Sequence, residues 1–438
     1  MTQRRLAFRI AAALALGLAV LPACAAAADE SFSRTRLPNG LTLLVRENPV
    51  APVVAVSLQV KMGTRWETRE SAGISNLVQL MLVRGTTTLN GNQIVEAADR
   101  MGGTIDARGD ADTSEISATA LARYWSEILD LVADVALHPT IPEGTFRAVR
   151  DFLIRQVRNR GDRPFEVAMD TLTDRIFSPH PYAWDPIGLR ESLERIDRNA
   201  LIQHDRRHYV PAGIAIAVSG RVSAAEVQAK VERLFSGMSG GSPPVAAPPE
   251  PPPPAASRDA LAVPGAQAQI MMGRLGPTFT DADFPAVKVL SSILGGGMAG
   301  RLFSRLRDKQ ALAYTTATQC PWRVDKGYLL ALLGTAPENV ERAQAALASE
   351  LARIQQEPVS EEELQIGKAS LLGDLEMDRR TNARQAWYMA SLEIMGVGYE
   401  FLDRYVSQVR AVTVADVQRV AQRYLSPLRT VIVAPPPK

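Results

Sequence analysis

The feature that most constrains the fold is a segment that occurs once in each half of the chain. The first copy is IDRNALIQHDRRHYVPAGIAIAVSG and the second is VTVADVQRVAQRYLSPLRTVIVAPP. Each predicts a capping residue, an amphipathic helix, a proline stop and an apolar strand, in that order. The positions that match at one constant offset are Asp197 and Thr413, Leu201 and Val417, Pro211 and Pro427, and Ile216 and Ile432. Preserved spacing at several positions favours duplication over chance recurrence.

The two copies lie on either side of a proline-rich segment. Residues 239–259 are dominated by proline, glycine, serine and alanine, a composition that builds no core and keeps a chain extended. We interpret this segment as a linker between residues 29–238 and residues 260–438. Each of these parts has the length of an ordinary domain.

The order of strand and helix patterns predicts the fold class. In the first half, LTLLVRENPVAPVVAVSLQVKMG contains two apolar strand patterns around an Asn-Pro turn signal. Longer helical patterns such as ARYWSEILDLVADVAL and TFRAVRDFLIRQVRNR follow. We therefore expect an α+β fold in which each half is a mainly antiparallel sheet with helices packed on one face.

Composition and the N-terminus bear on location. Hydrophobic residues make up 46% of the 438, charged residues 22%, and a net charge of +2 gives no field that would attract nucleic acid. Residues 1–28 carry basic residues, a short apolar run and small residues, the pattern of an export signal rather than a membrane span. We expect a periplasmic or secreted protein. Lipid anchoring at Cys24 is the alternative, because LPAC resembles a lipobox.

The segment GTRWETRESAGISNLVQLMLVRGTTTLNG resembles the opening of the pitrilysin/insulinase family of zinc metallopeptidases. The residues that fit the family's frame are Gly63, Glu67, Gly73, Met81, Leu82, Gly85 and Thr86. The resemblance continues through the second half and covers nearly all of the chain after residue 28. It implies two homologous domains that together form half of a clam-shell chamber.

The catalytic motif of that family is altered in this sequence. In the family, a helix carries His-x-x-Glu-His, which places two zinc-binding imidazoles and a general-base carboxylate on one face. Here the three positions are Asn76, Gln79 and Leu80. The family's third ligand, a Glu on a later helix, corresponds to Gln156, or to Val157 if the register shifts by one. The resemblance therefore predicts a chain that holds no metal of its own.

A rival metal site must be weighed on a different helix. His204 and His208 are four residues apart and could share a helix face beside Asp205. The repeat argues against this site, because the matching segment VAQRYL contains no histidine. His138 and His180 stand beside prolines at predicted turns and are interpreted as structural.

Two features of the family's substrate chamber are present. The resemblance implies that Arg307 and Tyr314, seven residues apart, face the zinc site of a partner, where a guanidinium and a phenol hydroxyl suit a substrate carbonyl and its oxyanion. It also implies an edge strand to which a peptide adds through main-chain hydrogen bonds. The residues of that strand are Gly103, Thr104, Ile105, Asp106 and Ala107, with Asp106 in place of the family's usual Asn.

Three functional hypotheses follow. The first is a non-catalytic subunit that supplies Arg307 and Tyr314 to an insulinase-family partner with an intact HxxEH, so that zinc resides in the partner and peptides are the substrates. The second is an inert peptide-binding or structural homologue. The third, which we rank last, is an independent peptidase with a displaced metal, since the four histidines of the chain are scattered. The peptide substrate and the stoichiometry lie beyond the sequence.

Overall fold

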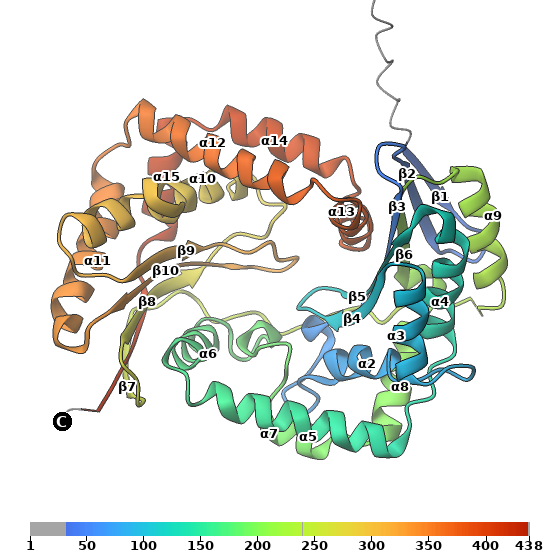
Figure 1. Ribbon diagram of the computed structural model, residues 1–438. Coiled ribbons are helices and arrows are strands. Elements are labelled where there is room, and N and C mark those ends of the chain that lie inside the picture. The colour runs from blue at the N-terminus through green and yellow to red at the C-terminus, as the bar shows by residue number, and fades with distance from the viewer. Residues whose placement is uncertain (1–31, 239, 437–438) are drawn as a thin grey trace, which may run out of the picture.

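The computed structural model describes residues 32–238 and 240–436, which form two mixed β-sheets surrounded by helices (Figure 1). The predicted export signal, residues 1–28, and Cys24 lie outside the described residues. The first sheet has six strands in the order β1-β2-β6-β3-β5-β4. Their bounds are β1 Phe32–Arg36, β2 Thr42–Glu47, β3 Val53–Val60, β4 Thr104–Gly109, β5 Ser114–Leu121 and β6 Ile214–Gly220.

The second sheet has five strands in the order β7-β11-β8-β10-β9. Their bounds are β7 Ser257–Ala262, β8 Ala268–Leu275, β9 Thr315–Gln319, β10 Tyr328–Thr335 and β11 Arg429–Ala434. In each sheet one pair is parallel, β2 with β6 and β7 with β11, and the neighbouring pairs are antiparallel. The two sheets therefore share one connectivity, as the repeated segment predicts.

The repeated segment folds into the same unit in both halves. Asp197 caps α8 (Arg198–His208) by accepting a hydrogen bond from the backbone N–H of Ala200. Thr413 caps α15 (Val414–Tyr424) through a capping box with Asp416. Each helix leads into the strand that forms the parallel pair of its sheet, β6 beside β2 or β11 beside β7. An oxygen-bearing side chain at this position satisfies a backbone N–H that the first turn of a helix cannot pair.

One expectation from the apolar patterns of the first half needs refinement. The two strand patterns around the Asn-Pro signal form β2 and β3, but these strands do not pair with each other. Strand β6 lies between them and pairs with both. The reason is that β6 buries every residue, so it gains most in the centre of the sheet, where both of its faces and both of its edges are covered.

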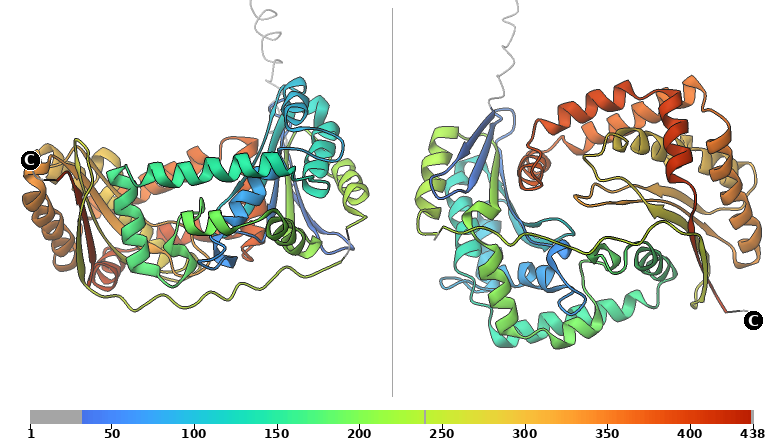
Figure 2. Two further views of the ribbon diagram at one scale, coloured as in Figure 1. Left: turned by 90° about the horizontal axis from the view of Figure 1, so that it is seen from below. Right: turned by 180° about the vertical axis from the view of Figure 1, so that it is seen from behind.

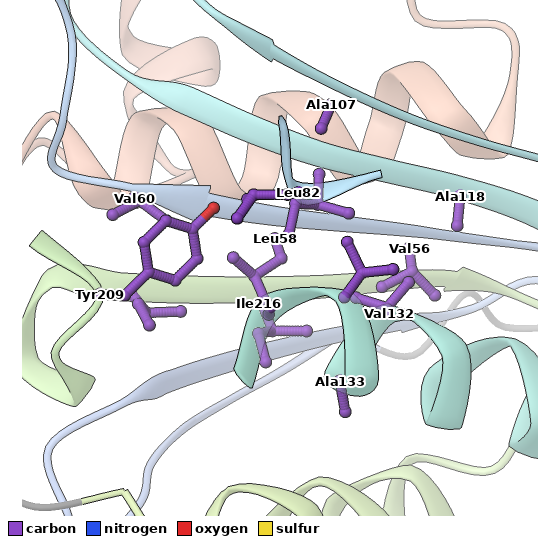
Figure 3. Packing of buried hydrophobic residues seen from close by; sticks show 14 of the residues in the cluster. Val56, Leu58, Val60, Leu82, Ala107, Ala118, Val132, Ala133, Tyr209 and Ile216 are labelled. Carbon is purple, nitrogen blue, oxygen red and sulfur yellow. The ribbon is translucent and has the colours of Figure 1, made fainter. Parts of the chain in front are cut away.

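Helices of each half pack on one side of that half's own sheet. In the first half, α2 Ile74–Leu82, α3 Gly91–Arg100, α4 Trp125–Leu137 and α9 Ala224–Phe235 contact the sheet, and α5 Glu143–Arg160, α7 Arg190–Arg195 and α8 form an outer layer next to α2. In the second half, α10 Phe284–Gly295 and α11 Val340–Gln356 contact the sheet, and α12 Glu361–Asp378, α14 Phe401–Ala411 and α15 pack on α10. Figure 3 shows Leu82 of α2 and Val132 of α4 beside Val56 and Leu58 of β3 in the first core.

Two further helices exchange places between the halves. Helix α6 (Pro164–Phe177) belongs to the first half but packs on β8 and β11 of the second sheet, where Leu172 and Phe177 join an apolar cluster. Helix α13 (Asn382–Ile394) belongs to the second half but packs on β3 and β6 of the first sheet through Met389 and Ala390. Both exchanged helices lie in the concave middle of the molecule (Figure 1). Each sheet is therefore covered on its second face by the other half.

The proline-rich segment lies along one side of the molecule (Figure 2). Residues 240–256 contain no helix or strand, and β7 begins at Ser257, so the last three residues of the predicted linker are part of a strand. Two polar contacts attach the segment to the rest of the molecule. The indole Nε1 of Trp66 donates to the carbonyl of Pro244 at 2.9 Å, and Lys326 pairs with Glu250 at 3.3 Å.

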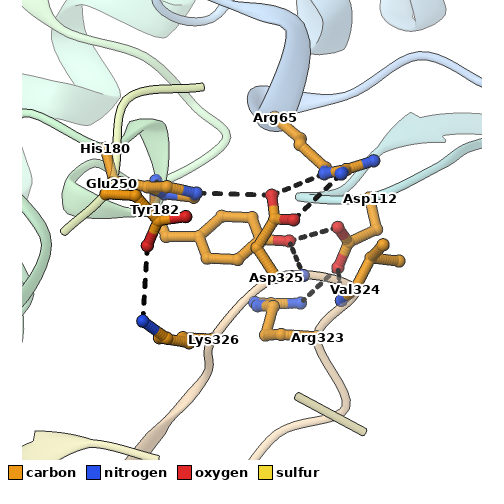
Figure 4. A network of polar contacts seen from close by, with 9 residues as sticks. All are labelled: Arg65, Asp112, His180, Tyr182, Glu250, Arg323, Val324, Asp325 and Lys326. Atoms are coloured by element: carbon orange, nitrogen blue, oxygen red, sulfur yellow. Dashed lines mark hydrogen bonds and ion pairs between the residues drawn. The ribbon is translucent and has the colours of Figure 1, made fainter. Parts of the chain in front are cut away.

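Polar contacts also join the two halves (Figure 4). The guanidinium of Arg65 donates two hydrogen bonds to Asp325, at 2.5 and 2.9 Å. His180 Nε2 lies 3.3 Å from the same carboxylate, and the backbone N–H of Asp325 donates to the hydroxyl of Tyr182 at 3.4 Å. Burial alone would raise the pKa of Asp325, but the hydrogen bonds from His180 and Arg65 lower it to about 2. The carboxylate thus stays ionised at neutral pH and fixes the halves to each other.

Within the described residues, no helix is both long and apolar enough to cross a bilayer.

Candidate functional site

Helix α2 occupies the position at which the sequence places the altered metal motif. Its N-terminus is anchored by Glu67, whose carboxylate accepts hydrogen bonds from the backbone N–H of Gly73 at 2.9 Å and of Ser75 at 3.0 Å. The indole of Trp184 also donates to Glu67, at 3.2 Å. Burial raises the pKa of Glu67 above its ordinary value, against the lowering effect of these bonds. The carboxylate satisfies first-turn donors at the positive end of the helix dipole.

Gly73 is required where α2 begins. It adopts a φ of +92°, in the left-handed region, and a Cβ at this position would lie 2.7 Å from the Cα of Gly188. Gly188 also has a positive φ, and the two backbones touch. The frame of the motif is therefore held by a close backbone approach that larger residues would prevent.

Gln79 stands where a general base would be needed, and it is fully buried. Its Nε2 donates to the hydroxyl of Tyr209 at 2.9 Å, while its Oε1 has no partner among the described residues. Burial raises the pKa of Tyr209 well above its ordinary value, so its hydroxyl stays neutral. An amide in this place cannot take a proton from water.

The two residues of α2 at the family's ligand positions, Asn76 and Leu80, also make structural contacts. The Oδ1 of Asn76 accepts a hydrogen bond from the backbone N–H of Gly109, at the end of β4, at 3.4 Å. Leu80 is partly buried against the first core. Gln156, on α5, is partly buried and makes no hydrogen bond with the described residues. Helices α2 and α5 are neighbours, so the structure brings together the two helices that carry the predicted positions.

The histidine pair of α8 lies behind α2. The rings of His204 and His208 are 4.4 Å apart between centroids. His204 Nε2 lies 3.1 Å from the hydroxyl of Ser75, and His208 Nδ1 bonds the carbonyl of Lys61 at 2.6 Å. Burial and the neighbouring His208 and Arg207 charges lower the pKa of His204 to about 3, so the ring is neutral. Both rings thus have structural hydrogen bonds, and Arg207 beside them disfavours a cation.

Arg307 and Tyr314 lie at the free edge of the second sheet. Arg307 is on a π-helical turn, Phe303–Asp308, and Tyr314 directly precedes the edge strand β9. Both side chains are exposed, Tyr314 by 53%. The Arg307 guanidinium lies over the Phe303 ring at 4.9 Å, and within the described residues neither group has a hydrogen-bond or ion-pair partner. Two donors are therefore available to a bound molecule.

Strand β4 is the corresponding edge of the first sheet. Thr104 and Asp106 are exposed, whereas Ile105 and Ala107 turn toward the protein. Gly103 approaches β5 so closely that a Cβ would lie 1.7 Å from the carbonyl oxygen of Thr119. On the side away from β5, the described part of the chain provides no strand that pairs with β4, so its outer backbone groups can accept one.

Comparison with known proteins gives the family. Residues 42–184 match the family model described as Insulinase (Peptidase family M16), and residues 195–371 match the model described as Peptidase M16 inactive domain. The chain belongs to the M16 family. It is thus an M16 peptidase-like protein, and the family resemblance predicted from the sequence is confirmed.

Relatives cover almost the whole M16 chain. An uncharacterised zinc protease of Rickettsia bellii is 24% identical over 416 residues, which span 93% of this chain and 98% of the relative. An uncharacterised zinc protease of Mycobacterium tuberculosis is 27% identical over 396 residues, 90% of both chains.

Solved structures of M16 proteins share the fold. The peptidase M16 inactive domain from Pseudomonas fluorescens superposes with a TM-score of 0.86 at 22% identity, over 93% of this chain and 99% of that one. A protease from Helicobacter pylori superposes with a TM-score of 0.88 at 21% identity, over 93% and 100%. The predicted α+β class with two homologous sheets is confirmed.

Zinc, the metal of M16 peptidases, does not fit the residues at this position. Of the four side chains, Leu80 has no donor atom, Gln79 is committed to Tyr209, and Asn76 to the β4 backbone. The fourth, Gln156, offers only a neutral amide, which is a poor zinc ligand. Among residues 32–238 and 240–436, no three side chains of His, Cys, Asp or Glu gather closely enough to hold a metal ion. We therefore derive no metal chemistry for this chain.

Sequence reasoning missed the polar contacts between the halves. Arg65, Tyr182 and Asp325 come from three distant segments, and no spacing rule connects them. The one signal available was the interruption of the helical patterns around His180, where the buried Nδ1 of His180 accepts from the backbone N–H of Tyr182 at 3.1 Å. His180 is structural, as its position beside a proline suggested.

Proposed function

We propose that this chain is a non-catalytic subunit of an exported M16 zinc peptidase. It supplies Arg307 and Tyr314 to a partner subunit of the same family that carries an intact HxxEH and the zinc. The observation that supports this proposal is a contrast between two places. At α2 the motif positions serve folding, with Gln79 buried on Tyr209, whereas Arg307 and Tyr314 are exposed donors at a sheet edge.

The proposed chemistry assigns separate roles to the two subunits. A peptide would lie along the free edge of β4 or of its equivalent in the partner and form main-chain hydrogen bonds there. Arg307 and Tyr314 would donate to the carbonyl of the scissile peptide and hold the negative charge that develops on its oxygen. Removal of one such donor costs on the order of 10²-fold in rate.

The first experiment is affinity purification of the tagged chain from the cell envelope of its native host, followed by mass spectrometry. We expect a second M16 protein with an intact HxxEH at near-equimolar amount. We also expect the mature N-terminus to lie after residue 28, or a lipid on Cys24. Recovery of this chain alone would refute the divided enzyme and favour an inert peptide-binding role, for which the open edge of β4 is the supporting observation.

The reconstituted complex tests the residues. We expect Arg307→Ala and Tyr314→Phe each to lower kcat/KM for a reporter peptide by roughly 10²-fold. Arg342→Ala is the matched control, because Arg342 is an exposed arginine of the second half on α11. Its activity should equal that of the wild type. Activities of all three variants within twofold of the wild type would show that the pair takes no part in catalysis.

A further inference from the structure

A cavity outside the motif region contains a carboxylate without a partner. The cavity has a volume of about 460 Å³ and lies between α8 and the C-terminal ends of α4 and α9. Such a volume falls in the range of small-molecule sites. Its walls include Ala136 and Leu137 of α4, Val210 after α8, and Leu234 of α9. These residues give the cavity one apolar side, and its polar residues lie on α8 and at the end of α4.

Asp205 is the acidic residue among those that line it. Its Oδ1 is shielded from solvent and has no hydrogen-bond donor, and within the described residues its carboxylate takes part in no hydrogen bond or ion pair. Burial raises its pKa to about 7, and only Arg206 acts against this. An enclosed carboxylate that lacks a partner costs free energy, so its presence needs an explanation.

The surroundings of Asp205 favour a positively charged guest. The C-terminal turns of α4 and α9 carry partial negative charge, and both reach the cavity wall. The other titratable groups at the cavity are Arg206, His138 and Tyr209. His138 is engaged by Asp134 at 3.1 Å, and Arg206 forms no ion pair with Asp205 in the described chain. The carboxylate is therefore free for a ligand.

We propose that this cavity binds an alkylammonium group, such as a lysine side chain. The ammonium would rest on the Asp205 carboxylate, and the aliphatic stem would lie against Leu137, Val210 and Leu234. An amine with an apolar stem matches a site that is apolar at its wall and anionic at one point. Tyr209 of the cavity bonds Gln79 of α2, but neither α2 nor Arg307 lines the cavity, so the proposal stands whether or not the chain pairs with a catalytic subunit.

Isothermal titration calorimetry on the purified chain at pH 8 tests the proposal. The probe is Nα-acetyl-lysine methylamide, and the matched neutral probe is Nα-acetyl-norleucine methylamide. We expect saturable one-to-one binding of the lysine derivative and at least tenfold weaker binding of the norleucine derivative. At pH 5 the lysine derivative should bind more weakly, because the carboxyl group is then protonated. Equal binding of the two probes, or no binding of either, would overturn the proposal.

Variants locate the site. Asp205→Asn should lose at least tenfold in affinity, whereas Glu226→Gln, an exposed carboxylate of α9 outside the cavity, should bind as the wild type does. Gly237 lines the cavity and a Cβ there meets no atom within 4 Å, so Gly237→Phe places a ring at the cavity wall and reduces the space for a ligand. It should also abolish binding. Binding that is retained in both Asp205→Asn and Gly237→Phe would show that the amine binds elsewhere and would overturn the proposal.

A third probe distinguishes the source of the amine. Butylammonium has the stem and the charge of lysine without its backbone. Equal affinity for butylammonium and the lysine derivative would identify a pocket for free amines. Tighter binding of the lysine derivative would identify a pocket for a side chain within a polypeptide. Either result supports an alkylammonium site.

Discussion

At the scale of single residues, the altered motif is integrated into the fold. Gln79 and Tyr209 form a buried hydrogen bond between α2 and the end of α8, at the point where the family has a catalytic carboxylate. A carboxylate there would be fully buried, and burial disfavours its charged form. Gln79 therefore contributes to the stability of the fold as a buried, hydrogen-bonded amide.

Removal of the Tyr209 hydroxyl tests this role. Tyr209→Phe leaves the Gln79 amide buried without an acceptor, which should lower the free energy of unfolding by about 1–3 kcal/mol. Urea denaturation followed by circular dichroism measures the change. Tyr124→Phe is the control, because the Tyr124 hydroxyl makes no hydrogen bond in the described chain. Equal stability of the two variants would contradict the argument.

Asp205 predicts a dependence of stability on pH. Its folded pKa of about 7 exceeds the ordinary value of 3.8, so between these pH values the folded state binds a proton that the unfolded state has lost. Stability from this group is therefore full below pH 4 and falls as pH rises to 7, by about 1–4 kcal/mol. Asp205→Asn should remove the fall, seen as urea midpoints at pH 5 and 8 that differ less than in the wild type.

At the scale of elements, the sequence predicted which helices and strands form better than it predicted which sheet each helix packs on. The repeat located α8, β6, α15 and β11, because capping residues and proline stops are local signals. The exchange of α6 and α13 could not be predicted. Their apolar faces, such as Leu172 and Met389, require a sheet, but nothing in a periodic pattern says which of two equivalent sheets it will be. Long-range pairing of this kind is decided by the whole chain.

The same limit applies to the site. The frame of α2 placed Asn76, Gln79 and Leu80 on a helix, since spacing is local. Which partners they take depends on α8 and β4, which come from elsewhere in the sequence. The roles of Arg307 and Tyr314 stay a prediction, because exposed side chains show their function only when a ligand is bound.

The start of α2 gives a test of the frame. Gly73→Ala forces a Cβ to within 2.7 Å of Gly188 at a φ of +92°, so we expect a loss of roughly 2 kcal/mol or more in unfolding free energy. Gly144→Ala on α5 is the matched control, where a Cβ meets no atom within 4 Å. That variant should be neutral or more stable by up to about 1 kcal/mol. Thermal and urea unfolding measure the stability of both variants. A similar change in the two variants would indicate a general effect of alanine rather than strain at Gly73.

At the scale of the whole molecule, the two halves are one folding unit. Each sheet relies on a helix from the other half, and Arg65, Asp325 and Tyr182 link them across the junction. Residues 240–256 of the proline-rich segment add little to this union, since their polar contacts with the rest of the described chain are those of Pro244 and Glu250.

Cleavage of the linker checks this view. A protease site inserted between Pro252 and Pro253 should yield a nicked protein whose fragments elute together in size-exclusion chromatography, because the exchanged helices still cover both sheets. Either fragment expressed alone should aggregate, because an apolar sheet face is then exposed. Fragments that separate after cleavage and remain soluble would show independent domains.

The exchange of α13 also determines when, during translation, the first sheet can be completed. The face of the first sheet that contains Leu44, Ala55 and Ala217 stays uncovered until residues 382–394 have been made. More than half of the chain is therefore synthesised before α13 can cover this apolar surface. A chain released by a ribosome that stalls in the second half would be prone to aggregation, and we expect holdase chaperones to bind the nascent chain during this interval.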